Sequence, residues 1–237
     1  MSPKSAVSAY RNRLLSALSA DDLATLRPHL ESVSLERGKT LERPNKRIEF
    51  VYFPETATAS VIGGATVPDK NVEIGTIGWE GMTGLPLIYG NHRSPHETFI
   101  QIPGEATRIA ASELRLAMDQ SRTLRPLFLK YAQAFSIQTA HTAVANGQGA
   151  LAQRLARWIL MTQDRVEGED LPLTHEFLSL MLAVRRPGVT EAVNELTRKG
   201  LITHERGIIA VRDREGLIES AGGFYGIPEA EYERLLG

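Results

Sequence analysis

Two adjacent arginines, Arg185 and Arg186, stand immediately before a stretch with helical spacing. Pro187 follows them, and the apolar residues Val189 and Val193 recur at the interval of one helical turn. The free N–H groups and the backbone dipole already make the N-terminus of a helix positive, so two further positive charges there indicate a negatively charged partner. The alternative is a solvated turn, because paired arginines are common on protein surfaces.

Residues 174–200 have the pattern of two short helices joined by a tight turn. The first helix carries Phe177, Leu178 and Met181, the stretch "AVRRP" interrupts the pattern, and the second helix follows. The next segment, "GLITHERGIIAVRD", predicts two short strands with a turn at "ERG". Together these elements predict a winged helix-turn-helix, which is a DNA-binding motif.

In this motif the N-terminal end of the second helix enters the major groove, so its first residues face phosphates and base edges. An arginine fork matches O6 and N7 of guanine, a threonine bonds a phosphate or contacts a thymine methyl group, and a glutamate accepts from a cytosine amino group. Thr174 is expected to cap the first helix, whose free N–H groups could hold a second phosphate. The predicted DNA-binding residues are Thr174, Arg185, Arg186, Gly188, Thr190 and Glu191.

The composition narrows the classes of function. The 237 residues include 27 Lys+Arg and 28 Asp+Glu, a formal net charge of −1, so any DNA contact must come from a local patch. The absence of cysteine excludes disulfides, thiolate metal sites and a cysteine nucleophile. No apolar run is long enough for a signal or membrane segment, so a cytoplasmic location without a membrane partner is expected. Since no nucleophile elbow, H-E-x-x-H or P-loop motif occurs, no catalytic residue and no enzymatic activity are predicted.

The elements that position the DNA-binding segment fall into successive parts of the chain. Residues 8–30 predict short helices, and residues 33–109 predict short strands of a small barrel or sandwich, separated by turn residues. Ser112 is expected to cap the helix that follows. The predicted domains are a β-roll sensor domain at 1–122, a dimerisation helix and hinge at 123–147, and a DNA-binding domain at 148–237.

A long helix is predicted over residues 124–146, and its apolar residues lie on two sides. A helix that is apolar on two sides usually packs against two partners, here its own barrel and a second copy of the chain. The alternative is a helix buried within a single chain. The stretch "NGQG" at 146–149 predicts a hinge before the next amphipathic helix.

Residues 173–202, "LTHEFLSLMLAVRRPGVTEAVNELTRKGLI", resemble the DNA-binding unit of the Crp/Fnr family of bacterial transcription regulators. Ala183 falls at the family's small turn position, Val189 and Leu196 at core positions, and Arg186 at a DNA-contacting arginine. The resemblance extends over nearly the whole chain. It implies an α+β architecture with an N-terminal cyclic-nucleotide-binding-type β-roll, a long dimerisation helix and a C-terminal winged helix-turn-helix. It also implies a homodimeric transcription regulator that binds an inverted repeat in double-stranded DNA, with RNA polymerase and a small effector as further candidate partners.

The second helix of this unit departs from the family pattern. Pro187 and Glu191 stand where the family usually has a glutamate and an arginine that contact bases. Proline lacks an N–H donor and fixes its own φ angle, so it replaces a base-contacting side chain with a rigid start of the helix. The DNA sequence bound is therefore expected to differ from the family's usual operator.

The predicted β-roll sensor domain departs further from the family pattern. Cyclic-nucleotide-binding members of the family share a phosphate-binding cassette, Gly-Glu-x-Gly-Leu followed by Arg-Ser/Thr-Ala, which "GMTGLPLIYGNHRSP" matches only in part. Met82 stands where the family's glutamate holds the ribose hydroxyl, and Pro95 replaces the alanine. A thioether cannot replace a carboxylate acceptor, so control by cyclic AMP is not expected. The residues that could hold another anion are Gly84, Leu85, Arg93 and Ser94; alternatively, Arg93 is an exposed loop arginine.

Two further interpretations concern metals and partners. His92 and His96 lie four residues apart, but the intervening proline and turn residues argue against a helical metal pair, so no metal, haem or other cofactor is expected. A second hypothesis for the function is a β-roll and winged-helix scaffold that binds a protein partner or a small anionic ligand without binding DNA. The negative charges of Glu191 and Glu195 on the second helix favour this hypothesis.

Overall fold

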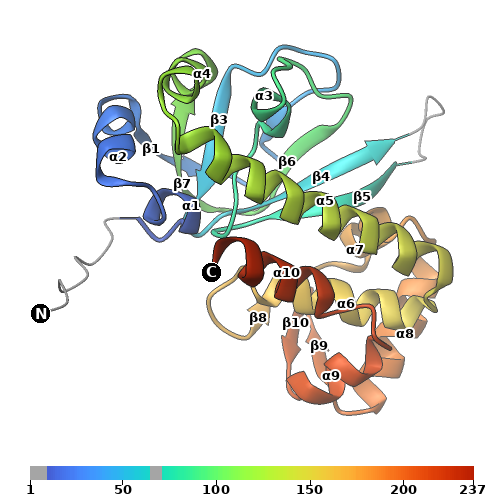
Figure 1. Ribbon diagram of the computed structural model, residues 1–237. Coiled ribbons are helices and arrows are strands. Elements are labelled where there is room, and N and C mark those ends of the chain that lie inside the picture. Colours follow the sequence, from blue (N-terminus) through green and yellow to red (C-terminus); the bar gives the residue numbers. More distant parts are fainter. Residues whose placement is uncertain (1–9, 65–70) are drawn as a thin grey trace, which may run out of the picture. The chain divides into compact units, whose positions relative to one another are not determined.

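The computed structural model describes residues 10–64 and 71–237 (Figure 1). The chain forms two compact units. One contains the described residues of Met1–Ala59 and Ile77–Ala132, and the other contains those of Ser60–Thr76 and Gln133–Gly237. Residues 8 and 9 of the predicted N-terminal helices lie outside the described residues. The predicted domains, 1–122, 123–147 and 148–237, stay a prediction.

Two antiparallel sheets form the first unit from the segment that was predicted to be rich in strands. Its strands are β1 (Glu31–Leu35), β2 (Thr40–Glu42), β3 (Phe50–Pro54), β6 (Glu97–Ile102) and β7 (Gly104–Ala110). One sheet has the order β1-β7-β3, and in the other β2 pairs with β6. Phe53, Ile100 and Ile109 from these strands are fully buried and form part of the core. This arrangement confirms the predicted β-roll architecture.

Short helices flank these sheets. They are α1 (Arg13–Ser16), α2 (Ala20–Leu26), the 3-10 helix η1 (Arg27–His29), α3 (Leu85–Ile88) and α4 (Ala111–Gln120). The short helices predicted near the N-terminus are thus confirmed. The prediction that Ser112 caps a helix was wrong, because strand β7 passes directly into α4 and Ala110 is the residue before the helix. The Ala111 amide donates to the Glu49 carbonyl at 2.8 Å, which satisfies one amide of the first turn without a side-chain cap.

Helix α5 (Leu124–Gln148) runs without a break from one unit into the other (Figure 1). The predicted helix at 124–146 is therefore confirmed and extends two residues further. Phe128 and Tyr131 are buried, whereas Leu129 and Val144 are 42% and 46% exposed. The predicted hinge at 146–149 was too long, because α5 continues through most of it and only Gly149 and Ala150 separate it from α6.

The second unit combines a strand pair with the C-terminal half of the chain. Its elements after α5 are α6 (Leu151–Gln163), β8 (Asp170–Leu171), α7 (His175–Met181), α8 (Arg186–Arg198), β9 (Ile202–Glu205), β10 (Ile208–Val211), α9 (Arg214–Ser220) and α10 (Ile227–Leu236). Strands β4 (Thr58–Gly64) and β5 (Asn71–Ile77) are neighbours, and the C-terminal sheet has the order β8-β10-β9. The predicted α+β class is confirmed. None of the helices in the described part of the chain is both long and apolar enough to cross a membrane.

A buried carboxylate joins β5 to α6 inside the second unit. Glu73 is 5% exposed, and its Oε1 accepts hydrogen bonds from Thr76 Oγ1 at 3.0 Å and Trp158 Nε1 at 2.7 Å. Burial raises the pKa of Glu73, against the opposing effects of its hydrogen bonds and of the charge on Arg157. On α5, the Gln138 side-chain amide accepts from the Thr76 N–H at 2.8 Å and donates to the Thr76 carbonyl at 3.3 Å. Strand β5 is thus bound to both helices by polar contacts.

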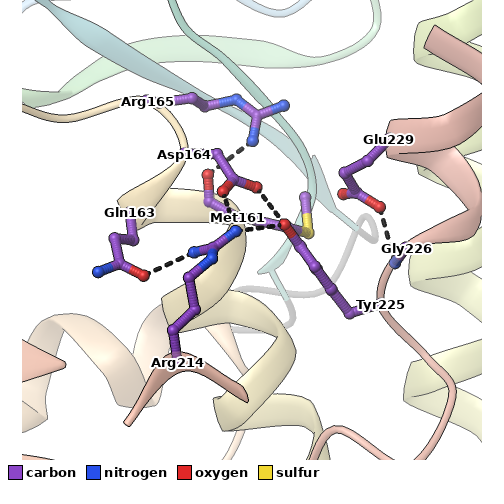
Figure 2. A network of polar contacts seen from close by, with 8 residues as sticks. All are labelled: Met161, Gln163, Asp164, Arg165, Arg214, Tyr225, Gly226 and Glu229. Carbon is purple, nitrogen blue, oxygen red and sulfur yellow. Dashed lines mark hydrogen bonds and ion pairs between the residues drawn. The ribbon is translucent and has the colours of Figure 1, made fainter. Parts of the chain in front are cut away.

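A polar network ties the C-terminal segment to the end of α6 (Figure 2). Arg214, the first residue of α9, donates to Gln163 Oε1 and to Asp164 Oδ1, each at 2.6 Å. The same guanidinium donates to the Tyr225 hydroxyl at 2.8 Å, and that hydroxyl donates to Asp164 Oδ2 at 2.8 Å. Burial, and next to it the charge of Asp164, raises the pKa of Tyr225, so the phenol stays protonated and acts as a donor. The network fixes the segment that leads into α10.

Candidate nucleic-acid interface

The turn between α7 and α8 depends on one residue in a left-handed backbone conformation. Ala183 has φ 51°, which an L-residue other than glycine adopts only at a cost. Two backbone hydrogen bonds hold this turn, from the Ala183 amide to the Leu180 carbonyl at 3.2 Å and from the Val184 amide to the Ser179 carbonyl at 3.0 Å. The Ala183 side chain itself is exposed. The tight turn predicted between two short helices is confirmed.

Both arginines predicted to meet the negative partner are exposed at the start of α8. Arg185 occupies the N-cap position with φ −73° and ψ 147°, and Arg186 is the first helical residue. Pro187 lies in the first turn, where its missing N–H removes no intrahelical bond. The first turn of α8 contains no acidic residue. The two guanidinium groups therefore add their charge to the positive end of the helix dipole.

The opposite face of α8 is buried and fixes how the helix presents this end. Val189, Val193 and Leu196 are at most 1% exposed, as predicted for core positions. Gly188 has a packing role in addition, since a Cβ atom built there would lie 3.2 Å from the side chain of Leu151 on α6. The sequence pattern did not indicate this contact. Further along α8, Glu191 is exposed one turn beyond the arginines.

The start of α7 and the turn of the wing lie next to each other. Thr174 is the N-cap of α7, and its Oγ1 accepts from the Phe177 amide at 3.2 Å, so the predicted cap is confirmed. The predicted wing is also confirmed. In its turn Arg206 and Gly207 both have positive φ, as the tight turns of β-hairpins require. A Cβ atom built on Gly207 would lie 3.4 Å from the Thr174 methyl carbon. This distance is an ordinary van der Waals contact, so it is the φ of +79° at Gly207 that favours glycine in the wing turn.

A pair of histidines that sequence reasoning missed connects α7, α8 and the wing. His175 Nδ1 lies 3.0 Å from Thr190 Oγ1 on α8, and the His175 ring stacks on that of His204 on β9 with centroids 4.5 Å apart and planes at 24°. The Nε2 atoms of both rings are buried without a hydrogen-bond partner. Burial lowers the pKa of His175, and the charges of His204 and Arg186 lower it further. No sequence periodicity links residues of a helix and a strand, so no local signal could have shown this pair.

In the first unit, the candidate residues Gly84 and Leu85 begin α3. Gly84 has φ +77°, and a Cβ atom built there would lie 2.6 Å from Val51 Cγ2, so only glycine fits. The Gly84 amide donates to Oε1 of the buried Glu42 at 2.7 Å. Burial raises the pKa of Glu42, and this hydrogen bond opposes the rise. Met82 is fully buried and belongs to the core.

The other two candidates, Arg93 and Ser94, lie in the loop before β6. Arg93 is exposed, whereas Ser94 is buried and its carbonyl accepts from the Asn45 amide at 2.6 Å. Ser94 Oγ accepts from the His96 amide at 3.0 Å. Among the residues that the structure describes, no hydrogen bond joins this pair to Gly84 or Leu85, and no cluster of three or more potential ligands could hold a metal ion. The role of these four residues in binding an anion stays a prediction.

The two helices, the tight turn and the wing form a winged helix-turn-helix, a class of domain that binds DNA, and comparison with known proteins gives the family resemblance. Residues 153–220 match the model of the Crp-like helix-turn-helix domain. No curated protein matches the chain. A Crp/Fnr-family protein from Eubacterium rectale has a TM-score of 0.69 at 14% identity, covering 89% of this chain and 98% of its own.

Two other solved structures have the same fold. FixK2 from Bradyrhizobium japonicum has a TM-score of 0.68 at 14% identity and covers 80% of this chain and 96% of its own. A Crp-family transcriptional regulator from Thermus thermophilus has a TM-score of 0.65 at 15% identity and covers 81% of this chain and 97% of its own. The predicted resemblance to the Crp/Fnr regulators is thus confirmed. Residues 153–220 thus form a Crp-like helix-turn-helix domain, and the chain has the fold of these solved structures.

Proposed function

We propose that the protein acts in the cytoplasm as a homodimer that binds an inverted-repeat operator and regulates transcription. In this proposal helix α8 of each protomer enters the major groove, and the two half-sites lie about one DNA turn apart, roughly 34–36 Å. The observation that carries the proposal is the exposed Arg185–Arg186 pair at the positive end of a helix whose other face is fixed in the core. We propose no catalytic activity for the chain.

The proposed contacts follow from the chemistry of each exposed group. Arg185 and Arg186 bind phosphates or the O6 and N7 acceptors of guanine. The start of α7, capped by Thr174, binds a phosphate through its free amides. Thr190 and Glu191 lie on the same turn of α8 as Gly188 and contact base edges, while Gly188 lets α8 approach α6 closely. RNA polymerase is a further proposed partner of the DNA-bound protein.

The proposed dimer forms through α5. Leu129 and Val144 expose apolar side chains on this helix, at 42% and 46%. Covering such groups with the same helix of a second chain removes apolar surface from water, and two-fold symmetry is the commonest arrangement of oligomers. A two-fold dimer presents two copies of α8, which explains why an inverted repeat is expected.

We further propose that cyclic AMP does not control this regulator. Met82 stands in place of the carboxylate that would accept from a ribose hydroxyl, and it is fully buried. A small anionic effector bound by Gly84, Leu85, Arg93 and Ser94 is compatible with the exposed guanidinium of Arg93. Because cyclic AMP is not expected to act, adding it should leave the DNA affinity unchanged.

The test is a binding selection followed by titration. The wild-type protein would first select duplexes from a random pool, and fluorescence anisotropy would then measure its affinity for the selected duplex at several salt concentrations, with and without cyclic AMP. Replacing either Arg185 or Arg186 by alanine should weaken binding by about five- to 150-fold, because each lost guanidinium contact to a base or phosphate is worth on the order of 1–3 kcal/mol. The logarithm of affinity should also fall less steeply with salt.

Arg198 provides the matched control. It is exposed at the opposite end of the same helix, so Arg198→Ala removes one arginine without changing the end that enters the groove. Its effect on affinity should be small. Affinity that is independent of DNA sequence, or an unchanged affinity of the Arg185 and Arg186 variants, would contradict the proposal and favour the scaffold that binds a protein partner instead.

A further inference from the structure

The hydroxyl of Thr190 is held by two hydrogen bonds within the protein. Thr190 Oγ1 donates its proton to the Arg186 carbonyl at 3.1 Å, one turn earlier on α8. His175 Nδ1 lies 3.0 Å from the same oxygen. A hydroxyl has a single proton, so once that proton is given to Arg186 the second bond must come from His175 Nδ1–H. The network therefore assigns the proton of the neutral imidazole to Nδ1.

The other nitrogen of this ring has no partner. His175 Nε2 is buried without a hydrogen bond, and so is Nε2 of the stacked His204. Three groups face His175: His204 from β9, and Arg186 and Thr190 from α8. Glu176 is the next residue after His175 on α7. Of these only Glu176 is negative, and it is exposed. Protonation of Nε2 would therefore place a charge near Arg186 without breaking the bond from Nδ1 to Thr190.

Taking the proposed function as given, we propose that His175 is a positioning residue of the DNA interface. By donating its Nδ1–H, it holds the Thr190 hydroxyl in the orientation whose proton goes to the Arg186 carbonyl, so that this group offers DNA a lone pair and a methyl group and no proton. In the major groove a lone pair matches the amino groups of adenine and cytosine, and a methyl group matches that of thymine. Thr190 therefore disfavours guanine at the base that it contacts, because guanine presents only acceptors there.

Protonation of His175 should also make the affinity for DNA depend on pH. The pKa of His175 is lowered in the free protein, chiefly by burial, so the ring is neutral near pH 7. Phosphates near the start of α7 favour the charged imidazolium, so DNA binding takes up a proton. Affinity for DNA should rise as pH falls from 8 to 6. A purely structural histidine would not produce this dependence on pH.

Two substitutions separate these effects. His175→Asn keeps an N–H donor close to the position of Nδ1 but cannot be protonated in this range, whereas His175→Leu removes both properties. On the duplex selected by the wild type, His175→Leu should bind about two- to tenfold more weakly and accept guanine at the base contacted by Thr190. His175→Asn should keep the base preference and lose the rise in affinity at low pH. Circular dichroism would establish that each variant is folded.

The outcomes distinguish this inference from the proposed function. If the wild type selects no sequence, the proposed function fails and the inference fails with it. If the wild type selects a sequence and His175→Leu keeps both its affinity and its base preference, the inference alone is overturned. Should His175→Leu not fold, Thr190→Val decides, because it removes the hydroxyl and keeps the shape: an unchanged base preference would overturn the inference, and a changed one would support it.

Discussion

Ala183 forms the turn between α7 and α8 in a backbone conformation that favours glycine, with φ 51°. Replacing it by glycine removes the contact between Cβ and the backbone, which costs about 1–2 kcal/mol in this conformation, although glycine also gains entropy in the unfolded chain. We expect Ala183→Gly to raise the free energy of unfolding by about 0.5–1 kcal/mol. Urea denaturation followed by circular dichroism would measure this change.

The control for this prediction is Ala230→Gly, on the exposed side of α10. In a helix the same exchange lowers the free energy of unfolding by about 0.5–1 kcal/mol, because glycine loses more conformational freedom. The two variants should therefore shift stability in opposite directions. A loss of stability in both would mean that the strain at Ala183 is not released by glycine.

At individual positions, the sequence revealed what is encoded locally. Thr174 could be predicted as a cap because a threonine before an apolar periodic run is a helix-start signal. The exposure of Arg185 could be predicted because this residue lies in the turn between two helices, and turns lie at the protein surface. The contact between His175 and His204 could not be predicted, since it joins a helix to a strand of the wing. The packing partners of a residue depend on the tertiary fold, and no local pattern shows them.

Among the elements, β5 and α6 share the buried carboxylate of Glu73. Because burial raises the pKa of Glu73, the folded protein holds this proton more tightly than the unfolded chain does. Stability is then fully present below the ordinary pKa of glutamate and decreases as pH rises towards the raised folded value. Glu73→Gln removes the ionisation and keeps an acceptor for Trp158 Nε1.

We therefore expect the stability of Glu73→Gln, relative to the wild type, to increase as pH rises above the ordinary glutamate pKa of 4.5. The slope should reach at most about 1.4 kcal/mol per pH unit. Urea denaturation at a series of pH values would measure it, and Glu219→Gln, at an exposed carboxylate, is the matched control. A difference between wild type and Glu73→Gln that is constant above the ordinary glutamate pKa would show that Glu73 does not change ionisation on unfolding.

Element boundaries were predicted well where hydrophobic periodicity is long, as for α5, and less well where a strand passes directly into a helix. Ser112 has the residue type of a cap, but hydrogen bonding of the Ala111 amide to Glu49 starts α4 earlier. A long-range backbone contact thus overrides a local signal. The same limitation applies to Gly84, whose amide is bound by the distant Glu42.

For the whole molecule, the proposed dimer makes a prediction about α5. Replacing Leu129 and Val144 by glutamate places charges in the proposed interface, where burying them without partners is unfavourable. We expect the double variant to sediment as a monomer and to lose most of its affinity for the selected duplex. Sedimentation velocity at micromolar concentration would show the change. The control is Leu116→Glu, at a similarly exposed leucine, 54%, on α4; a wild type that is itself monomeric would contradict the prediction.

The second unit takes residues 60–76 from an early part of the chain and residues 133–237 from the end. During synthesis the first of these segments leaves the ribosome well before the second is made. The hydrogen bond between Trp158 and Glu73 can therefore form only after α6 has emerged. Contacts between such distant segments slow folding, because the intervening chain must first be closed into a loop. Folding of the second unit is therefore expected to be completed only after translation has passed α6, although most of its strands β4 and β5 was made much earlier.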